Sequence, residues 1–135
     1  MSDEDIRWEQ RLHSLTKAIA LLNEAAEIEA PSQVEQMGLI QAFEVCYELG
    51  WKLLQDYLKY QGYDPKSPRD SIKQAYQDEL ISDGETWLKM TQTRNLTVHT
   101  YDGALVESIE QTIKTHYLKL LNALHNDFSN RANQA

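Results

Sequence analysis

The most informative segment for the architecture of this chain is residues 40–58, which read IQAFEVCYELGWKLLQDYL. Its large apolar side chains recur every three or four residues, from Ile40 and Phe43 through to Leu54. That spacing collects them on one face of an α-helix, whereas a half-buried strand would alternate apolar and polar residues. We therefore expect a long helix that ends near Gly62, because glycine readily adopts the left-handed conformation that closes helices.

Four other segments have the same helical spacing, and they cover residues 8–26, 68–80, 87–94 and 105–128. Residues that break or cap helices separate them: Pro31-Ser32, Ser67-Pro68, Ser82-Asp83-Gly84 and the run from His99 to Gly103. No segment has the alternating pattern of a strand hairpin. The sequence thus predicts an all-α bundle of five helices, two of them short.

The length of 135 residues is that of one domain, so we expect residues 1–135 to form a single helical domain. The polar stretch from about 131 to 135 is expected to be a disordered tail. No apolar run approaches the roughly 20 residues of a membrane span. The acidic N-terminus lacks the apolar core of a signal peptide. We therefore expect no membrane association and a cytoplasmic location.

The composition is acidic, with 13 basic and 21 acidic residues and a formal net charge of −8. Proteins that coat nucleic acids are usually basic, so the balance excludes an extended basic surface. Half of the excess lies in residues 1–30, which contain 3 basic and 7 acidic residues. The segment 63–102 carries several cations: Lys66, Arg69, Lys73, Lys89 and Arg94. RNA binding would therefore need a small, local and salt-sensitive basic cleft.

Several residue types that often carry chemistry are predicted to have only packing roles. Cys46 is the single cysteine, which excludes a disulfide within the chain, and it lies on the apolar segment 40–58 as an inert buried thiol. His13, His116 and His125 lie on long predicted helices without a second metal ligand four residues later. No glycine loop for phosphate or serine elbow is present. We expect no metal and no cofactor.

The segment that stands apart is residues 94–102, RNLTVHTYD, where the fourth predicted helix runs into a loop. Histidine can move a proton near neutral pH, and arginine can bind a phosphate and offset charge in a transition state. Such a pair suffices for RNA cleavage without metal, in which the 2′-hydroxyl attacks the adjacent phosphate. On a continuous helix, His99 would lie about 140° around the axis from Arg94, so a break near Val98 is needed. The other interpretation is a helix C-terminus where both cations complement the helix dipole.

A resemblance to a known family bears on this choice. The pattern R-x-x-x-x-H-x-Y of Arg94, His99 and Tyr101, with polar Asn95 after the arginine, resembles the motif of the HEPN superfamily of ribonucleases. Other matching positions resemble the nucleotidyltransferase substrate-binding proteins, the family that contains the HepT toxins: Phe43-Glu44, Glu48-Leu49, Trp51-Lys52, Ser67-Pro68-Arg69 and Leu80-Ile81 through Trp87-Leu88 to Asp102. The resemblance spans about residues 8–125.

This resemblance implies an up-and-down four-helix bundle with an extra short helix, paired as a homodimer whose two motifs share one cleft. Arg94 and His99 would be the catalytic pair of an endoribonuclease toxin in a type VII HEPN–MNT toxin–antitoxin system. Asn95 would orient the motif or contact the phosphate. The substrate class would be RNA, with tRNA as a candidate.

Tyr101 resembles the tyrosine that the partner nucleotidyltransferase, the MNT antitoxin, modifies with AMP. The modification would attach a bulky anion two residues from His99, which would block the cleft and repel the substrate phosphate. ATP and Mg²⁺ would be requirements of the partner and not of this chain.

Glu44, Glu48 and Lys52 lie four residues apart and therefore share one helix face. One interpretation is a solvated stripe with a weak pair between Glu48 and Lys52, worth about 0.2–0.5 kcal/mol. The other is that a carboxylate here, Glu48 in particular, orients Arg94 as a supporting residue.

Two alternatives to a ribonuclease stay open at this point. The chain could be a non-catalytic subunit that presents substrate to a nucleotidyltransferase, which the acidic composition suits. A plain helical dimerisation module is the weaker alternative. Growth arrest on expression without the partner, lost in Arg94→Ala, separates a toxin from both.

Overall fold

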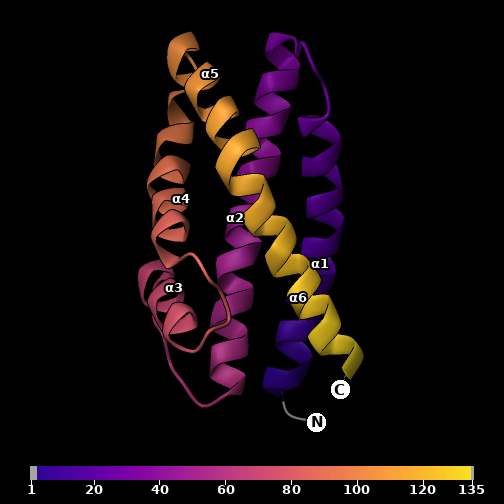
Figure 1. The fold of residues 1–135 in the computed structure, drawn as a ribbon, viewed down its shortest axis with the longest axis vertical. Coiled ribbons are helices and arrows are strands. Elements are labelled where there is room, and N and C mark those ends of the chain that lie inside the picture. Colours follow the sequence, from indigo (N-terminus) through magenta and orange to yellow (C-terminus); the bar gives the residue numbers. More distant parts are fainter. Residues whose placement is uncertain (1–2, 135) are drawn as a thin grey trace.

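The computed structural model describes residues 3–134, which fold into helices with no strand among them. The elements are α1 (Asp3–Ala26), α2 (Gln33–Tyr60), α3 (Pro68–Gln77), α4 (Gly84–Leu96), a 3₁₀ turn (Thr97–His99), α5 (Gly103–Thr112), a π-helical segment (Ile113–Tyr117) and α6 (Leu118–Gln134). The elements α5, π segment and α6 form one continuous rod that crosses the others diagonally (Figure 1).

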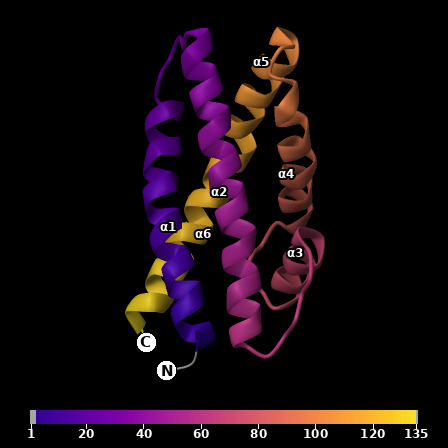
Figure 2. The ribbon, with the colours of Figure 1, turned by 180° about the vertical axis from the view of Figure 1, so that it is seen from behind.

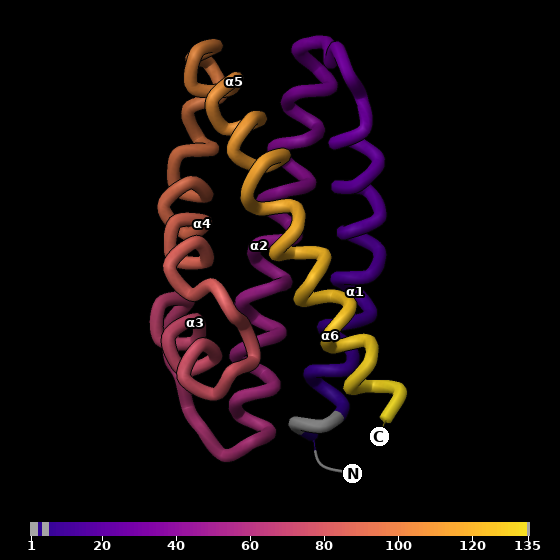
Figure 3. The backbone as a smooth tube through the Cα atoms, viewed as in Figure 1, coloured from indigo at the N-terminus to yellow at the C-terminus, as the bar shows by residue number. Residues whose placement is uncertain are grey.

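The four long rods alternate in direction, and α3 is the extra short helix beside the start of α4 (Figure 1). The predicted all-α, up-and-down bundle is therefore confirmed. Figure 3 shows that the first and last described residues lie at one end of the bundle. The turn between α4 and α5 lies at the opposite end.

The apolar stripes that the sequence predicts face a common core. Leu15 and Leu22 of α1, Phe43 and Leu54 of α2, and Trp87 of α4 are all buried. Gly50 is also buried, and it lies so close to α4 that an added Cβ would be only 3.1 Å from Cη2 of Trp87. The missing side chain thus lets α4 approach α2 closely.

Local capping explains where most helices begin and end. Ser32 opens α2 with a capping box to Glu35, and Ser67 opens α3 next to a proline at its first position. Gly62 follows the end of α2 with a φ of +101°, as the sequence predicts. The predicted end of the third helix at residue 80 is wrong. α3 ends at Gln77 because Glu79 has a φ of +61°, which a continuing helix does not allow.

The last predicted helix also differs in its register. The sequence spacing places Leu120 on the core face, but the structure buries Leu121 and leaves Leu120 half-buried. Among the buried residues of this rod, Ile109, Ile113, Tyr117 and Leu121 follow one another at strict steps of four residues. On an α-helix, four residues turn by about 40° more than a full circle, so side chains at such steps move gradually around the helix. The wider turn of the π segment corrects this and keeps them on the core face.

The C-terminal residues do not form the expected tail as far as the structure describes them. α6 continues to Gln134, and the guanidinium of Arg131 lies 5.4 Å from the ring centres of Tyr57 and Phe128. This stacking holds the last turns of α6 to the bundle. Ala135, the last residue of the predicted tail, lies outside the described residues.

Within residues 3–134, no helix combines the length and the apolar composition that crossing a bilayer requires.

Asp83 caps α4, and replacing it with alanine is expected to lower the free energy of unfolding by about 0.5–2 kcal/mol at neutral pH. Its Oδ1 accepts a hydrogen bond from the Thr86 backbone N–H at 3.0 Å, and its Oδ2 accepts one from the Thr86 hydroxyl at 2.8 Å. These bonds hold the pKa of Asp83 below its usual value.

The stabilisation by Asp83 should therefore be fully present above the pKa of an unfolded aspartate and be lost as the pH falls through the lowered folded value. Urea unfolding of both proteins at a series of pH values measures this. A difference between wild type and Asp83→Ala that does not shrink on acidification would contradict the assignment.

Candidate active site

The predicted motif lies at the end of α4 and in the turn that follows it. Arg94 and Asn95 are in the last turn of α4, His99 closes the 3₁₀ turn, and Tyr101 precedes α5. The Thr97 hydroxyl donates to the Arg94 carbonyl at 2.7 Å, which tightens the chain into the 3₁₀ turn. This turn supplies the break near Val98 that the sequence requires.

Arg94 is held against α2 by two carboxylates. Its Nε lies 3.3 Å from Oε1 of Glu48, and its Nη1 lies 3.8 Å from Oε2 of Glu44. The second oxygen of Glu48 accepts a hydrogen bond from Trp51 Nε1 at 3.1 Å. Glu48 thus pairs with Arg94 and Trp51, while Lys52 lies over the Trp51 ring at 6.0 Å and makes no ion pair with Glu48. The pair between Glu48 and Lys52 considered for a solvated stripe does not form.

His99 and Tyr101 are joined to each other on the outside of the molecule. His99 Nδ1 lies 2.8 Å from the Tyr101 hydroxyl, and the rings meet edge to face with centres 5.5 Å apart. When Nδ1–H donates to the phenol oxygen, Nε2 carries the free lone pair and can accept a proton. The phenol of Tyr101 thereby orients the imidazole of His99, and Tyr101 is 82% exposed.

The structure brings these residues to one end of the bundle but leaves Arg94 and His99 unbonded to each other. Among the described residues, no hydrogen bond or ion pair joins the two, so a substrate would have to bridge them. Asn95 is exposed next to Arg94. Leu96 and Val98 are also exposed, at 44% and 66%, so an apolar surface surrounds the motif.

The cations of segment 63–102 do not gather at the motif. Lys66, Arg69 and Lys73 lie on or before α3, at the far end of α4 from His99 (Figure 1). Two of the lysines are also paired, Lys66 with Asp64 at 2.6 Å and Lys89 with Glu85 at 3.7 Å. α4 is about 20 Å long, so α3 cannot supply charge to the same cleft. The expected basic cleft is reduced to Arg94 within one protomer.

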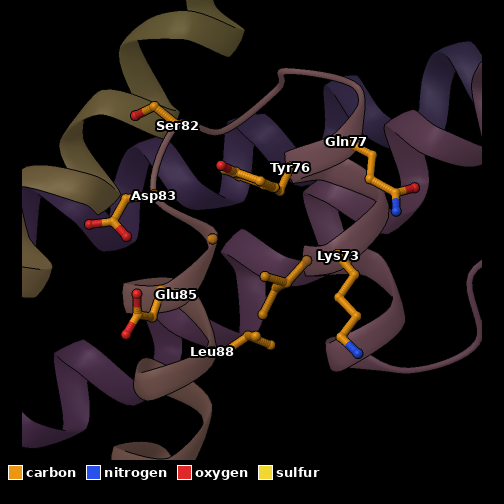
Figure 4. A pocket seen from close by; sticks show the side chains of 9 residues that line it. Lys73, Tyr76, Gln77, Ser82, Asp83, Glu85 and Leu88 are labelled. Atoms are coloured by element: carbon orange, nitrogen blue, oxygen red, sulfur yellow. The ribbon is translucent and has the colours of Figure 1, made fainter.

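A cavity of about 610 Å³ lies between α3 and the start of α4, and Lys73, Tyr76, Asp83, Glu85 and Leu88 are among its lining residues (Figure 4). No motif residue lines it. Asp83 uses both carboxylate oxygens to cap α4, and Glu85 is paired with Lys89 at 3.7 Å. We do not assign the reaction to this cavity.

Metal and thiol chemistry find little support in the side chains. Within the part of the chain that the structure describes, no three His, Cys, Asp or Glu side chains come together as metal ligands. Cys46 is fully buried, and that burial raises the pKa of its thiol to about 12. The thiol therefore stays protonated and unreactive, in agreement with the prediction that it is a packing residue.

Sequence reasoning missed two tyrosines that contact α4. The Tyr47 hydroxyl is hydrogen-bonded to Thr91, and the Tyr117 hydroxyl lies 2.7 Å from the Thr93 hydroxyl. Both tyrosines fit the apolar spacing of their helices and are buried, so their spacing indicates only core packing. Their partners, Thr91 and Thr93, are two of the three threonines on α4, which is a weak local sign of polar contacts.

Comparisons with known proteins agree with the resemblance. Residues 10–130 match the family described as nucleotidyltransferase substrate binding protein like. A protein named probable ribonuclease HepT, from Haemophilus influenzae, is 34% identical over 70 residues. That match covers 48% of each chain, so this chain spans about half the length of the curated relative.

Solved structures of similar proteins share the fold. A crystal structure of a protein from Thermus thermophilus is 36% identical, with a TM-score of 0.74 over 87% of this chain and 97% of the other. A tri-AMPylated HEPN toxin of Shewanella oneidensis, in complex with its MNT antitoxin, is 20% identical, with a TM-score of 0.75 over 96% and 98% of the two chains. A toxin–antitoxin structure of MntA and HpeT is also 20% identical, with a TM-score of 0.76 over 90% and 96%.

The latter two likenesses show the HEPN fold alone, and the family assignment rests on the family match over residues 10–130. Because that match covers nearly all of the helical bundle, this chain belongs to the family of nucleotidyltransferase substrate-binding proteins.

Proposed function

We propose that this protein is a metal-independent endoribonuclease toxin of the HepT type. The observation that carries the proposal is the arrangement at the end of α4, where Glu48 holds Arg94 and Tyr101 holds an exposed His99. A relative named as a probable ribonuclease HepT supports the activity class. The likeness to HEPN toxin structures supports the fold in which such a motif operates.

The chemistry needs only these side chains and the RNA. Nε2 of His99 takes the proton of a 2′-hydroxyl, and that oxygen attacks the adjacent phosphorus. The bond from phosphorus to the 5′-oxygen breaks, which leaves a 2′,3′-cyclic phosphate and a 5′-oxygen that takes up a proton. Arg94 donates hydrogen bonds to the non-bridging phosphate oxygens as charge accumulates on them.

A homodimer would complete this site. Leu96 and Val98 expose apolar surface beside His99, and burial of that surface would favour pairing at the motif. Pairing would bring His99 of the partner subunit into the same cleft, where it could donate the proton to the leaving oxygen. It would also place Arg94 of both protomers in the cleft, and so small a number of cations favours a short, accessible RNA segment such as a tRNA loop or end.

The same proposal includes a nucleotidyltransferase partner of the MNT type that transfers AMP to Tyr101, with ATP and Mg²⁺ bound by the partner. The phenol is 82% exposed and therefore accessible to a second protein. The modification of the HEPN toxin in the Shewanella structure supports this type of regulation.

The direct test is incubation of purified protein with RNA in the presence of EDTA. We expect cleavage that leaves 2′,3′-cyclic phosphate and 5′-hydroxyl ends and that weakens as salt is raised. Cleavage that requires added divalent metal, or products with 3′-hydroxyl ends, would overturn the mechanism.

A non-catalytic substrate-binding subunit is the second candidate. It is favoured by the scarcity of cations at the motif, where Glu44, Glu48 and Asp102 accompany Arg94. Expression without the partner separates the two. A toxin arrests growth and loses the effect in Arg94→Ala, whereas a binding subunit leaves growth unchanged in both forms.

Replacing Glu48 with glutamine is expected to lower RNA cleavage by up to about fivefold, because a partly exposed ion pair contributes roughly 0.2–1 kcal/mol to holding Arg94 in place. Stability should change by less than about 1 kcal/mol, since the Glu48 side chain is 37% exposed. Glu85→Gln, which removes a carboxylate from an exposed pair with Lys89, is the control. Cleavage and stability both equal to wild type in Glu48→Gln would remove the supporting role.

A further inference from the structure

The half of α4 that carries Arg94 has little apolar anchoring. The buried residues of this helix are Gly84, Trp87 and Met90, all in its first two turns. From Thr91 to Leu96 no residue is buried. Apolar packing therefore fixes the start of α4 but not the end that carries the motif.

Polar contacts hold this second half instead, and two of them, besides the ion pairs of Arg94, are made by hydroxyl groups. Tyr47 of α2 is hydrogen-bonded to Thr91, and Tyr117 of the π segment is bonded to Thr93 at 2.7 Å. Both tyrosine rings pack against Phe43, which stacks on Tyr117 with ring centres 5.5 Å apart and lies 6.5 Å from Tyr47. One aromatic cluster thus presents two hydroxyls to the motif helix.

The positions of the two threonines give these contacts a specific effect. Thr91 and Thr93 lie about 160° apart around the helix axis, measured across the face that carries Arg94, so the two bonds hold α4 on opposite flanks and resist its rotation. Arg94 lies between them, about 60° from Thr91 and about 100° from Thr93. On α2, Glu48 directly follows Tyr47. The rotation of α4 that the two tyrosines set therefore decides whether Nε of Arg94 faces the carboxylate of Glu48.

The π segment is what places the second hydroxyl. Tyr117 is its last residue, and the wider turn keeps that ring on the core face together with Ile113 and Leu121. Without the wider turn, the drift of the four-residue spacing would carry Tyr117 away from Thr93. π segments are often found at functional sites, and here the segment contacts the motif helix.

We propose that Tyr117, together with Tyr47, is a positioning residue that sets the rotation of α4. This rotation keeps Arg94 paired with Glu48 and orients its guanidinium toward the substrate phosphate. The inference rests on the proposed ribonuclease function. Tyr117 touches no substrate, and it acts through Thr93 and the helix that carries Arg94.

The test removes single hydroxyls and keeps the rings. Tyr117→Phe is expected to lower kcat about three- to tenfold with KM unchanged, which corresponds to the loss of one neutral hydrogen bond. Thr93→Val removes the same bond from the other side and should give the same loss. The double variant should lose no more than either single variant, because all three lack one and the same interaction.

The matched control is Tyr57→Phe. The Tyr57 hydroxyl accepts a hydrogen bond from Arg131 at 3.3 Å, and its ring packs on Trp8 and Phe128 away from α4. This variant also loses one hydroxyl contact of a packed tyrosine, and it should keep the wild-type kcat.

A second measurement does not depend on RNA cleavage. In ¹⁵N NMR, the Nε–H of Arg94, assigned by its absence in Arg94→Lys, should exchange slowly with solvent in wild type and Tyr57→Phe. It should exchange several-fold faster in Tyr117→Phe and Thr93→Val. If both variants keep the wild-type kcat and the wild-type Arg94 signal, the positioning role is overturned. If wild-type protein cleaves no RNA, the proposed function fails, and the Arg94 signal alone decides the role of Tyr117.

Discussion

His99→Ala is expected to lower RNA cleavage by about 10²–10⁴-fold, because removal of a general base or acid has effects of that size. The side chain is exposed, and its hydrogen bond goes to Tyr101, which is itself on the surface. Its removal should therefore leave the core and the unfolding transition unchanged. The loss would lie in the chemical step and not in the fold.

Arg94→Ala should be similarly inactive, since Arg94 is the basic residue in the last turn of α4 that would bind the phosphate. Arg94→Lys should recover little, because an ammonium cannot reproduce the two-point contacts of the guanidinium with Glu48 and a phosphate. The measurement is cleavage of a labelled RNA in EDTA, with His13→Ala as the control, since His13 is an exposed histidine on α1. Equal cleavage by wild type and His99→Ala would overturn the proposed ribonuclease mechanism.

Co-expression with the cognate nucleotidyltransferase is expected to add AMP to Tyr101 and to abolish cleavage. The adduct turns the phenol oxygen into an ester oxygen, which is a poor acceptor for the Nδ1–H of His99 that lies 2.8 Å away. It also places a phosphate charge beside the imidazole, where the substrate phosphate must bind. Loss of orientation and electrostatic repulsion both oppose the reaction.

Intact-mass spectra test the site of this modification. Tyr101→Phe should carry no adduct and should keep part of its activity in the presence of the partner. Tyr76→Phe is the matched control, since Tyr76 is 54% exposed but lies at the cavity beside α3. The same adduct on Tyr101→Phe would show that another residue is the acceptor.

Much of the fold could be predicted because helices are encoded locally. The stripe from Ile40 to Leu54 and the closing Gly62 need no knowledge of distant residues. Which face of the last rod lies against the core could not be predicted. Leu120 and Leu121 are both leucine, and only the π segment decides which of them faces the core.

The site was predictable in its residue types but not in its pairings. Chemistry and spacing make Arg94 and His99 candidates, and the family resemblance favours them over a helix-dipole role. The choice of Glu48 between Lys52 and Arg94 depends instead on how α2 and α4 pack. The same holds for Tyr117 and Thr93, which are 24 residues apart and whose bond depends on the rotation of two helices. Counting the cations of segment 63–102 also overstated the positive charge near His99. The segment includes α3 and the whole of α4, so most of its cations lie far from the motif.

The two ends of the described chain lie at the end of the bundle opposite the motif, as Figure 2 shows from behind. α2 has 28 residues, which makes the bundle about 40 Å long. A flexible linker with that root-mean-square span has roughly 50–60 residues. An affinity tag at either end would therefore leave His99 and Tyr101 unobstructed, whereas a nucleotidyltransferase fused through a linker of a few residues would be held near the opposite end from the tyrosine of its own chain.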